Sequence, residues 1–202
     1  MILYHLDRNN SINLETGIGF SRINCDLASS KLLSDFKGNV SMHGATYMSA
    51  SCSTMRIKLS SDLRPVIDIE MLDRNLHTTD ERILEYTLEL VRRLYFPQFP
   101  SRLQSLFALS SVEEFNRWPE LRIPQGTMYK LNVPDSTPKF DESWLKGGIM
   151  RGYTSSGYVV SYAPTLCFDT AYNYWSQIPS DSPRWEYLVE LPISSCELEI
   201  AL

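Results

Sequence analysis

The sequence has few of the residues that build metal sites and disulfide frameworks. It contains three histidines and four cysteines among 202 residues. The cysteines form no CxxC pair and no cluster with a histidine. Zinc sites need cysteine or histidine ligands at short, characteristic spacings, and disulfide-rich domains need several cysteines in a regular pattern. The sequence therefore predicts reduced thiols, no disulfide framework and no bound metal.

Long apolar runs and an excess of basic residues are also missing. No apolar stretch reaches the ~18 residues that a membrane-spanning helix needs, and no charged segment followed by an apolar run opens the chain. We therefore expect no membrane partner and a cytoplasmic location. The formal net charge of −5 argues against nucleic-acid binding over the whole surface, although one local basic site is compatible with it.

Hydrophobic residues make up 43% of the chain, which is enough for a folded core. The length fits one domain, residues 1–202. Strands outnumber helices and do not alternate with them regularly, so the pattern predicts the α+β class. Strands are predicted at residues 1–8, 55–61, 64–72, 103–109 and 127–133 and in the stretch 182–193, a hairpin or loop at 147–164, and a short helix at 165–177. Residues 9–54 show no sustained period, and we interpret residues from about 20 to 97 as an inserted or elaborated region.

The clearest helix signal covers residues 78–96. Thr78 and Glu81 have the spacing of a capping box, and apolar residues then follow at helical spacing. This pattern predicts that Leu84, Leu88 and Val91 are buried. It also predicts that Glu85, Glu89 and Arg92 lie in water.

The stretch "RWEYLVEL", residues 184–191, places a carboxylate at the start of a strand. Glu186 lies between Trp185 and Tyr187. It is either a solvated charge on an edge strand or a catalytic group. Common nucleotide, metalloprotease and serine-hydrolase motifs are missing from the chain. His43, in "MHGA", has loop-like surroundings, so we do not count it among the candidate site residues.

Three stretches together resemble the ADP-ribosyltransferase superfamily, in particular its His-Tyr-Glu branch. They are "LYHLDR", "SLFALSSVEEFNRW" and "RWEYLVEL", and they occur in the order that this branch uses. Two departures stand out: Leu6 replaces the glycine that follows the histidine, and no middle tyrosine is evident. The resemblance implies an ADP-ribosyltransferase-like split β-sheet core with a few flanking helices.

The resemblance also implies roles for individual residues. Glu186 would be catalytic, because cleavage of the nicotinamide–ribose bond builds positive charge that a fixed carboxylate stabilises in the transition state. The implied cofactor-binding residues are Tyr4, His5, Arg8, Arg102, Ser105, Phe107 and Tyr174. Arg184 and Trp185 would contact the substrate.

The implied reaction uses NAD as co-substrate and no metal. ADP-ribose would pass to an intracellular macromolecule, which is RNA, DNA or protein. Such an enzyme is best understood as the toxin of a toxin–antitoxin or phage-defence module, with an antitoxin protein as partner. Arg184 stands where arginine-modifying relatives carry a glutamate or glutamine, which makes protein arginine a less favoured target. Two alternatives stay open: a degenerate module that only binds a nucleotide or a partner, and an NAD glycohydrolase.

Overall fold

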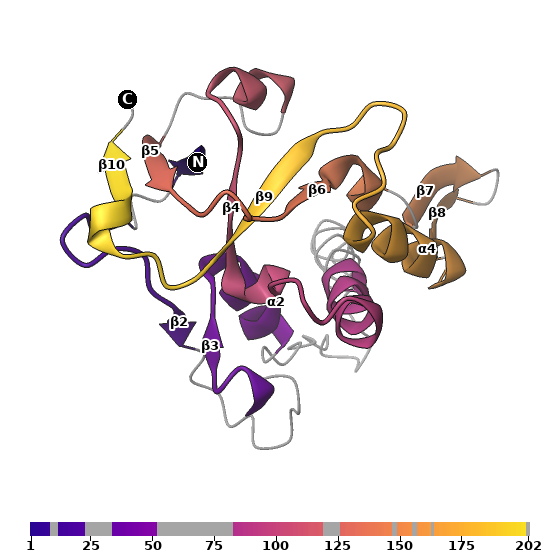
Figure 1. Cartoon of the computed structure of the whole chain (residues 1–202). Helices are drawn as coiled ribbons and strands as arrows, with labels where there is room; N and C mark the ends of the chain where they lie inside the picture. The colour runs from indigo at the N-terminus through magenta and orange to yellow at the C-terminus, as the bar shows by residue number, and fades with distance from the viewer. Residues whose placement is uncertain are drawn as a thin grey trace, which may run out of the picture.

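The computed structural model describes residues 1–8, 12–22, 34–51, 83–118, 126–146, 149–154, 157–162 and 164–200. Two three-stranded antiparallel sheets form its centre (Figure 1). The first has the order β1-β5-β10, with β1 at Ile2–Asp7, β5 at Thr127–Asn132 and β10 at Leu198–Ile200. The second has the order β4-β9-β6, with β4 at Ser105–Ala108, β9 at Trp185–Glu190 and β6 at Lys139–Asp141.

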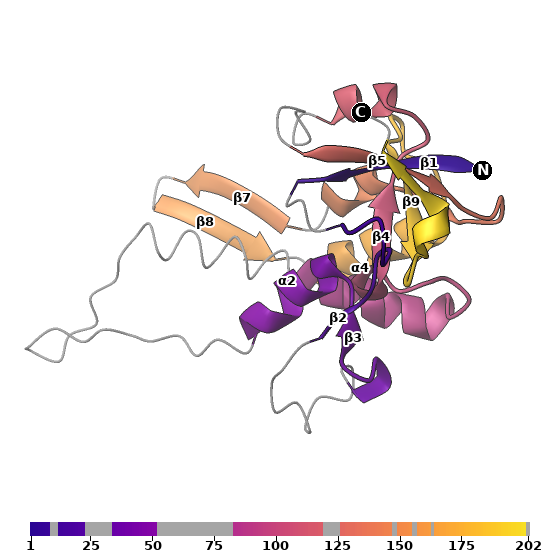
Figure 2. The ribbon, with the colours of Figure 1, turned by 90° about the vertical axis from the view of Figure 1, so that its left-hand side faces the viewer.

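One isolated bridge joins the two sheets. The backbone N–H groups of Tyr4 and Leu109 each donate to the carbonyl of the other residue at 2.8 Å. Figure 2 shows β1 and β5 running across the end of β4. The bridge therefore brings the N-terminal strand next to the sheet that contains β9.

Helices and smaller strands surround the two sheets. The α-helices are α2 (Met42–Ser51), residues 83–95, and α4 (Pro164–Trp175). The 3₁₀ helices are η1 (Arg102–Gln104), η2 (Glu113–Arg117), η4 (Glu142–Lys146) and η5 (Ser195–Glu197). Two strand pairs complete the description: β2 (Ser21–Arg22) with β3 (Asn39–Val40), and β7 (Ile149–Thr154) with β8 (Gly157–Tyr162). The predicted α+β class is thus confirmed.

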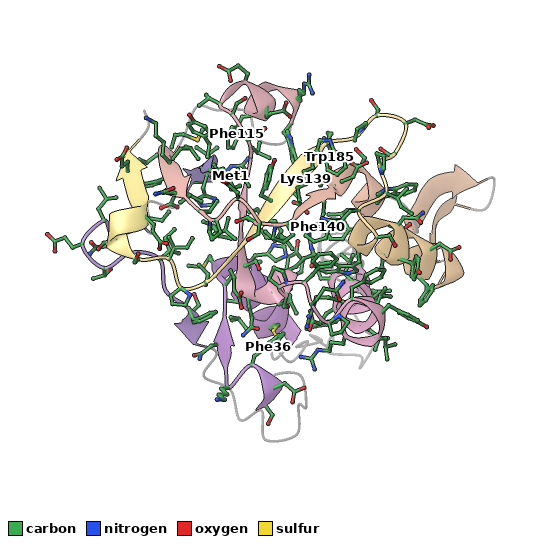
Figure 3. The ribbon with its side chains drawn as sticks, in the orientation of Figure 1. Met1, Phe36, Phe115, Lys139, Phe140 and Trp185 are labelled. Atoms are coloured by element: carbon green, nitrogen blue, oxygen red, sulfur yellow. The ribbon has the colours of Figure 1, made fainter. Side chains whose placement is uncertain are left out.

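An aromatic core lies between the β4-β9-β6 sheet and α4. Phe140, Tyr174 and Trp175 are fully buried, and Phe140 stacks on Tyr174 with ring centroids 4.9 Å apart. Figure 3 shows Phe140 among the densely packed side chains of this region. Leu88 from the 83–95 helix joins the same cluster. Among the described residues, no helix has the length and apolar character to cross a membrane.

The 83–95 helix matches the prediction on its apolar side and contradicts it on its acidic side. Leu84, Leu88 and Val91 are buried, as predicted. Glu85 and Glu89 are buried too, at 5% and 3% exposure, so their predicted place in water is wrong. Burial of these two carboxylates is possible because arginines pair with both.

Arg92, the third residue that we predicted in water, is half-buried. Its side chain is 12% exposed and pairs with Glu89 at 2.8 Å. The predicted capping box and the predicted strands at 55–61 and 64–72 lie outside the described residues.

Helix α2 is an element that the sequence pattern did not predict. Ser41 caps it, because its hydroxyl accepts the Gly44 N–H at 3.1 Å. A Cβ at Gly44 would lie 2.2 Å from the carbonyl oxygen of Leu103, so only glycine lets α2 pack this closely on η1. The apolar residues of α2 do not follow a helical period, which explains why the pattern failed. Its close packing places His43 beside η1.

Candidate active site

Side chains from both sheets line one cavity of about 290 Å³. The polar and aromatic lining residues include His5, His43, Arg102, Phe107, Trp118, Glu142 and Glu186. His5 comes from β1 and Glu186 from β9, near opposite ends of the chain. The fold nevertheless brings both residues into the wall of this one cavity.

Glu186 lies on the central strand of its sheet. β9 pairs with β4 on one side and with β6 on the other, where Phe140 is the partner of Glu186. Glu186 is only 4% exposed, so the interpretation as a solvated edge charge is wrong. Its Oε1 accepts a hydrogen bond from the Tyr174 hydroxyl at 2.7 Å and forms an ion pair with Arg102. Within the described residues both bonds reach Oε1, which leaves Oε2 for a ligand.

Arg102 joins two carboxylates through opposite sides of its guanidinium. Nη1 donates to Glu186 and, at 2.7 Å, to Tyr174. Nε and Nη2 donate to Glu85 at 3.1 and 3.0 Å. The resemblance implied a cofactor contact for Arg102 through a phosphate. Because the fork of the guanidinium is engaged on both sides, the geometry favours a different role, which is to hold the two glutamates in place.

The charges of the cluster formed by Glu85, Arg102 and Glu186 do not cancel. Burial acts to raise the pKa of Glu85, but Arg102 and then His43 outweigh it and hold that pKa far below its usual value. Burial likewise acts to lower the pKa of Arg102, and Glu186 and Glu85 together raise it. Two carboxylates and one guanidinium sum to a net charge of −1. Such a buried cluster attracts positive charge in the adjoining cavity.

His5 is a neutral hydrogen-bond acceptor in this cavity. Its Nδ1 lies 2.8 Å from the Phe107 carbonyl oxygen. A carbonyl oxygen can only accept, so Nδ1 carries the proton and Nε2 carries the free lone pair. Burial is the main cause that lowers the pKa of His5. A ligand hydroxyl group is a suitable partner for Nε2.

His43 is a site residue that the sequence analysis missed. Its ring lies 4.7 Å from the Phe107 ring, and its Nε2 is 3.2 Å from Oε1 of Glu85. Glu85, predicted in water, was missed as well. Both residues come from helices whose polar faces turn inward only because η1 packs against them. The ion pair between Glu85 and Arg102 forms only in the tertiary fold, so no pattern in the sequence indicates it.

A second cavity of about 320 Å³ adjoins the first. The two share His5, Leu6, His43 and Phe107 in their walls. Arg8 and Ser105, both predicted to bind the cofactor, line the second cavity. The Ser105 hydroxyl donates to the backbone carbonyl of Ser101 at 2.7 Å, so its hydrogen is already used. Arg8 is exposed at this end, and its neighbour Asp7, which lines the same cavity, is buried.

The family model described as "Protein of unknown function (DUF2441)" matches residues 3–200. The chain belongs to the DUF2441 family. No curated protein matches it.

Two aromatic residues to which the resemblance assigned cofactor binding, Tyr4 and Tyr174, lie outside the walls of the two cavities. Tyr4 precedes His5 on β1, and neighbouring residues of a strand point to opposite faces. Tyr4 therefore packs against the apolar cluster around Leu109. Tyr174 is fully buried and reaches Glu186 from the core, so it orients the carboxylate without lining the cavity.

The two residues predicted to contact the substrate are also held by other groups. Trp185 points away from Glu186 by strand alternation, and Lys139 Nζ lies 4.7 Å from its ring centroid (Figure 3). Arg184 pairs with Glu142, and its guanidinium carbon lies 4.8 Å from the ring centroid of Trp118. Since Glu142 and Trp118 line the first cavity, Arg184 supports its wall.

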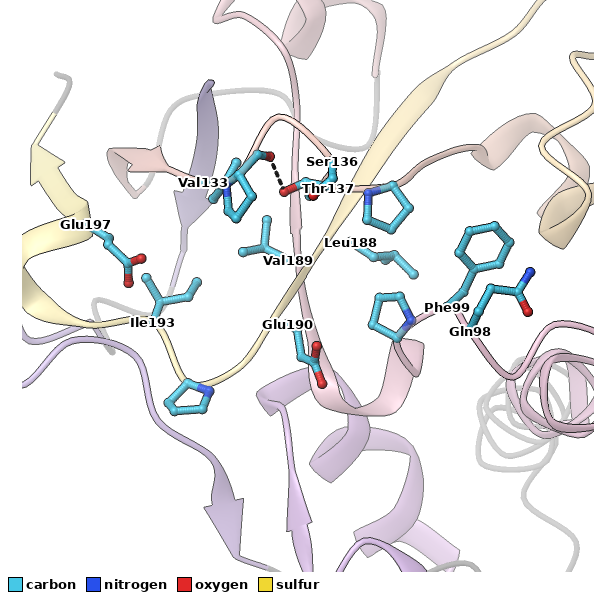
Figure 4. Close-up of a pocket in the computed structure, with 14 residues that line it drawn as sticks. Gln98, Phe99, Val133, Ser136, Thr137, Leu188, Val189, Glu190, Ile193 and Glu197 are labelled. Carbon is cyan, nitrogen blue, oxygen red and sulfur yellow. Dashed lines mark hydrogen bonds between the residues drawn. The ribbon is translucent and has the colours of Figure 1, made fainter.

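A larger cavity of about 440 Å³ lies along β9 and is lined by residues of a different kind (Figure 4). Its described walls are formed by prolines, aliphatic residues, small polar residues, Gln98, Phe99 and two glutamates, Glu190 and Glu197. None of these lining residues is a histidine, arginine or lysine. In the described part of the DUF2441 chain, no group of three or more histidine, cysteine, aspartate or glutamate side chains could hold a metal ion. We therefore take the 290 Å³ cavity as the candidate active site.

Proposed function

We propose that this DUF2441 protein is an NAD-dependent ADP-ribosyltransferase. One observation carries the proposal: Glu186 and His5, the two residues that the resemblance made central, line a single cavity. Arg102 and Tyr174 hold the carboxylate in place from behind. Groups that act on one bound substrate have to converge in this way.

The electrostatics of the cavity suit cleavage of a nicotinamide–ribose bond. Positive charge develops on the ribose as the bond breaks, and the net-negative cluster with Oε2 of Glu186 stabilises it. Preorganised charges in a buried site need little reorganisation during the reaction. His5 Nε2 accepts a ribose hydroxyl, and the Phe107 ring offers an apolar wall to the nicotinamide.

The dimensions of the site also support a dinucleotide. The two cavities share four lining residues and so lie next to each other, and in this proposal one extended ligand reaches from one into the other. Its nicotinamide end lies beside Glu186, and its phosphates lie toward Arg8. The two separate sheets, with His5 in one and Glu186 in the other, are compatible with an ADP-ribosyltransferase-like split core.

We further propose that the acceptor is an intracellular macromolecule, either RNA, DNA or protein. In this proposal the protein acts in the cytoplasm as the toxin of a toxin–antitoxin or phage-defence system, and an antitoxin restrains it. Hydrolysis of NAD would use the same residues with water as acceptor.

Leu6 supports a second candidate function, a degenerate module that binds a nucleotide without reacting. The His-Tyr-Glu branch has glycine at this position, and Leu6 lines both cavities here. Its side chain takes space that glycine would leave to a ligand. A bound nucleotide that is never consumed would favour this candidate.

The test compares two glutamates of β9. We expect Glu186→Gln to keep the fold and NAD binding but to lower the rate of NAD consumption by about 10²–10³-fold, because the negative charge is removed. Glu190→Gln is the matched control, since Glu190 is exposed and lines the other cavity. Single-turnover loss of NAD measures activity, and thermal melting checks the fold. Normal melting of Glu186→Gln with NAD consumption at the parent rate would overturn the proposal.

A separate incubation identifies the acceptor. The parent protein is mixed with labelled NAD and total cell lysate, and RNA, DNA and protein are then separated. Label in one fraction gives the acceptor class. NAD loss without label in any fraction indicates hydrolysis, and binding without loss favours the degenerate module.

A further inference from the structure

We propose that His43, oriented by Glu85, is the general base that takes the proton from the acceptor in this site. The inference rests on the proposed transferase function and adds a catalytic residue to it. The site described so far stabilises the ribose and binds its hydroxyl. It does not yet include a group that receives the proton of the attacking acceptor.

The tautomer of His43 follows from its neighbour. Nε2 is buried and lies 3.2 Å from Oε1 of Glu85, close enough for an ion pair but without a formed hydrogen bond. Catalytic hydrogen bonds are often loose before a substrate binds. An ionised carboxylate can only accept, so Nε2 carries the proton and Nδ1 keeps its lone pair.

Nδ1 is the nitrogen that a ligand can reach. The His43 side chain is 23% exposed and lines both cavities, while its other nitrogen is buried. The ring is held between Tyr47 and Phe107, each with a ring centroid 4.7 Å away. This packing orients the imidazole before the acceptor arrives.

His43 differs from His5 in the group that faces its ring. His5 has a backbone carbonyl as its partner, so a charge on its buried ring would be poorly compensated. His43 has the Glu85 carboxylate beside it. When His43 gains a proton, the cluster of Glu85, Glu186, Arg102 and His43 reaches a net charge of zero. The Glu186 carboxylate, by contrast, already accepts from Arg102 and Tyr174.

In the proposed transfer step, a proton moves to His43 as one bond to the ribose forms and another breaks. The acceptor gives the proton of its O–H or N–H group to Nδ1 of His43, and the acceptor atom bonds to C1′ of the ribose. The bond between that carbon and nicotinamide breaks, and its electron pair leaves with nicotinamide, which becomes neutral. The proton on His43 then passes to solvent.

Chemical rescue tests this role. His43→Ala should lower the transfer of label from NAD to macromolecules of total cell lysate by about 10²-fold, the ordinary contribution of a general base. Added imidazole should restore part of the activity by occupying the space left by the side chain. His43→Gln, which keeps most of the volume, should lose the same activity and gain nothing from imidazole.

His5→Gln is the matched control from the same cavity. It should weaken NAD binding, measured by calorimetry, and imidazole should not rescue it. An inactive parent protein would overturn both proposals. An active parent with a fully active His43→Ala variant, or with a loss that imidazole never restores while thermal melting stays normal, would overturn the role of His43 alone.

Discussion

The Tyr174 ring packs in the aromatic core, and its hydroxyl joins Glu186 to Arg102. Its hydroxyl donates to Glu186 and accepts from Arg102, both at 2.7 Å. Burial first, and then Glu186, raise the pKa of Tyr174, so the phenol stays protonated and keeps donating. The geometry of the candidate catalytic carboxylate thus depends on a residue in the aromatic core.

We predict that Tyr174→Phe destabilises the protein by about 1–3 kcal/mol, because a buried carboxylate and a buried guanidinium each lose a partner. NAD consumption should fall as well, since Glu186 loses its orientation. Tyr172→Phe on the same helix is the control: Tyr172 is 41% exposed, and its change should stay within about 0.5 kcal/mol. Urea unfolding measures both. Equal stability of the two variants would show that the Tyr174 hydroxyl contributes nothing.

The 83–95 helix connects the core to the candidate site. Its apolar residues pack under the sheet, and Glu85 from the same helix reaches Arg102. A helix that is well packed at Leu88 therefore fixes the position of Glu85 three residues earlier. Stability and site geometry are linked through this one element.

We predict that Leu88→Ala costs about 2–5 kcal/mol, because the side chain is fully buried and its removal leaves a cavity. Leu90→Ala on the same helix is the control, since Leu90 is 57% exposed. Urea denaturation of the two variants gives the difference. A Leu88→Ala variant as stable as Leu90→Ala would mean that the helix is not seated in the core.

At the scale of the whole molecule, buried carboxylates make stability depend on pH. Burial acts to raise the pKa of Glu85, Glu89 and Asp141, but Arg102, Arg92 and backbone N–H groups respectively outweigh it, and all three pKa values are lowered. The unfolded chain therefore binds more protons than the folded chain when the pH falls below the ordinary carboxylate range. The contribution of these groups is fully present above that range and is lost on acidification.

We predict that the free energy of unfolding falls slightly as the pH drops through ~6.5, because the lowered pKa of His5 leaves the folded chain with fewer protons than the unfolded chain. Below pH ~5 it falls more steeply, by up to about 1.4 kcal/mol per pH unit for each carboxylate. Urea unfolding between neutral pH and pH ~3 measures the curve. Unchanged or rising stability on acidification would contradict the buried ion-pair arrangement.

Local patterns in the sequence determined the α+β class, the strands around residues 127–133 and 185–191, and the buried face of the 83–95 helix. Each of these depends on residues a few positions apart, and a short period reports them directly. The resemblance also indicated His5 and Glu186 as site residues, because the three motifs occur in the order that the His-Tyr-Glu branch uses. The tertiary structure alone decided the environment of those residues. The ion pair between Arg102 and Glu186 joins residues 84 positions apart, and no local period reports such a contact. The burial of Glu85 and the position of His43 beside it arise in the same way, because a charge can be buried only where folding brings its partner.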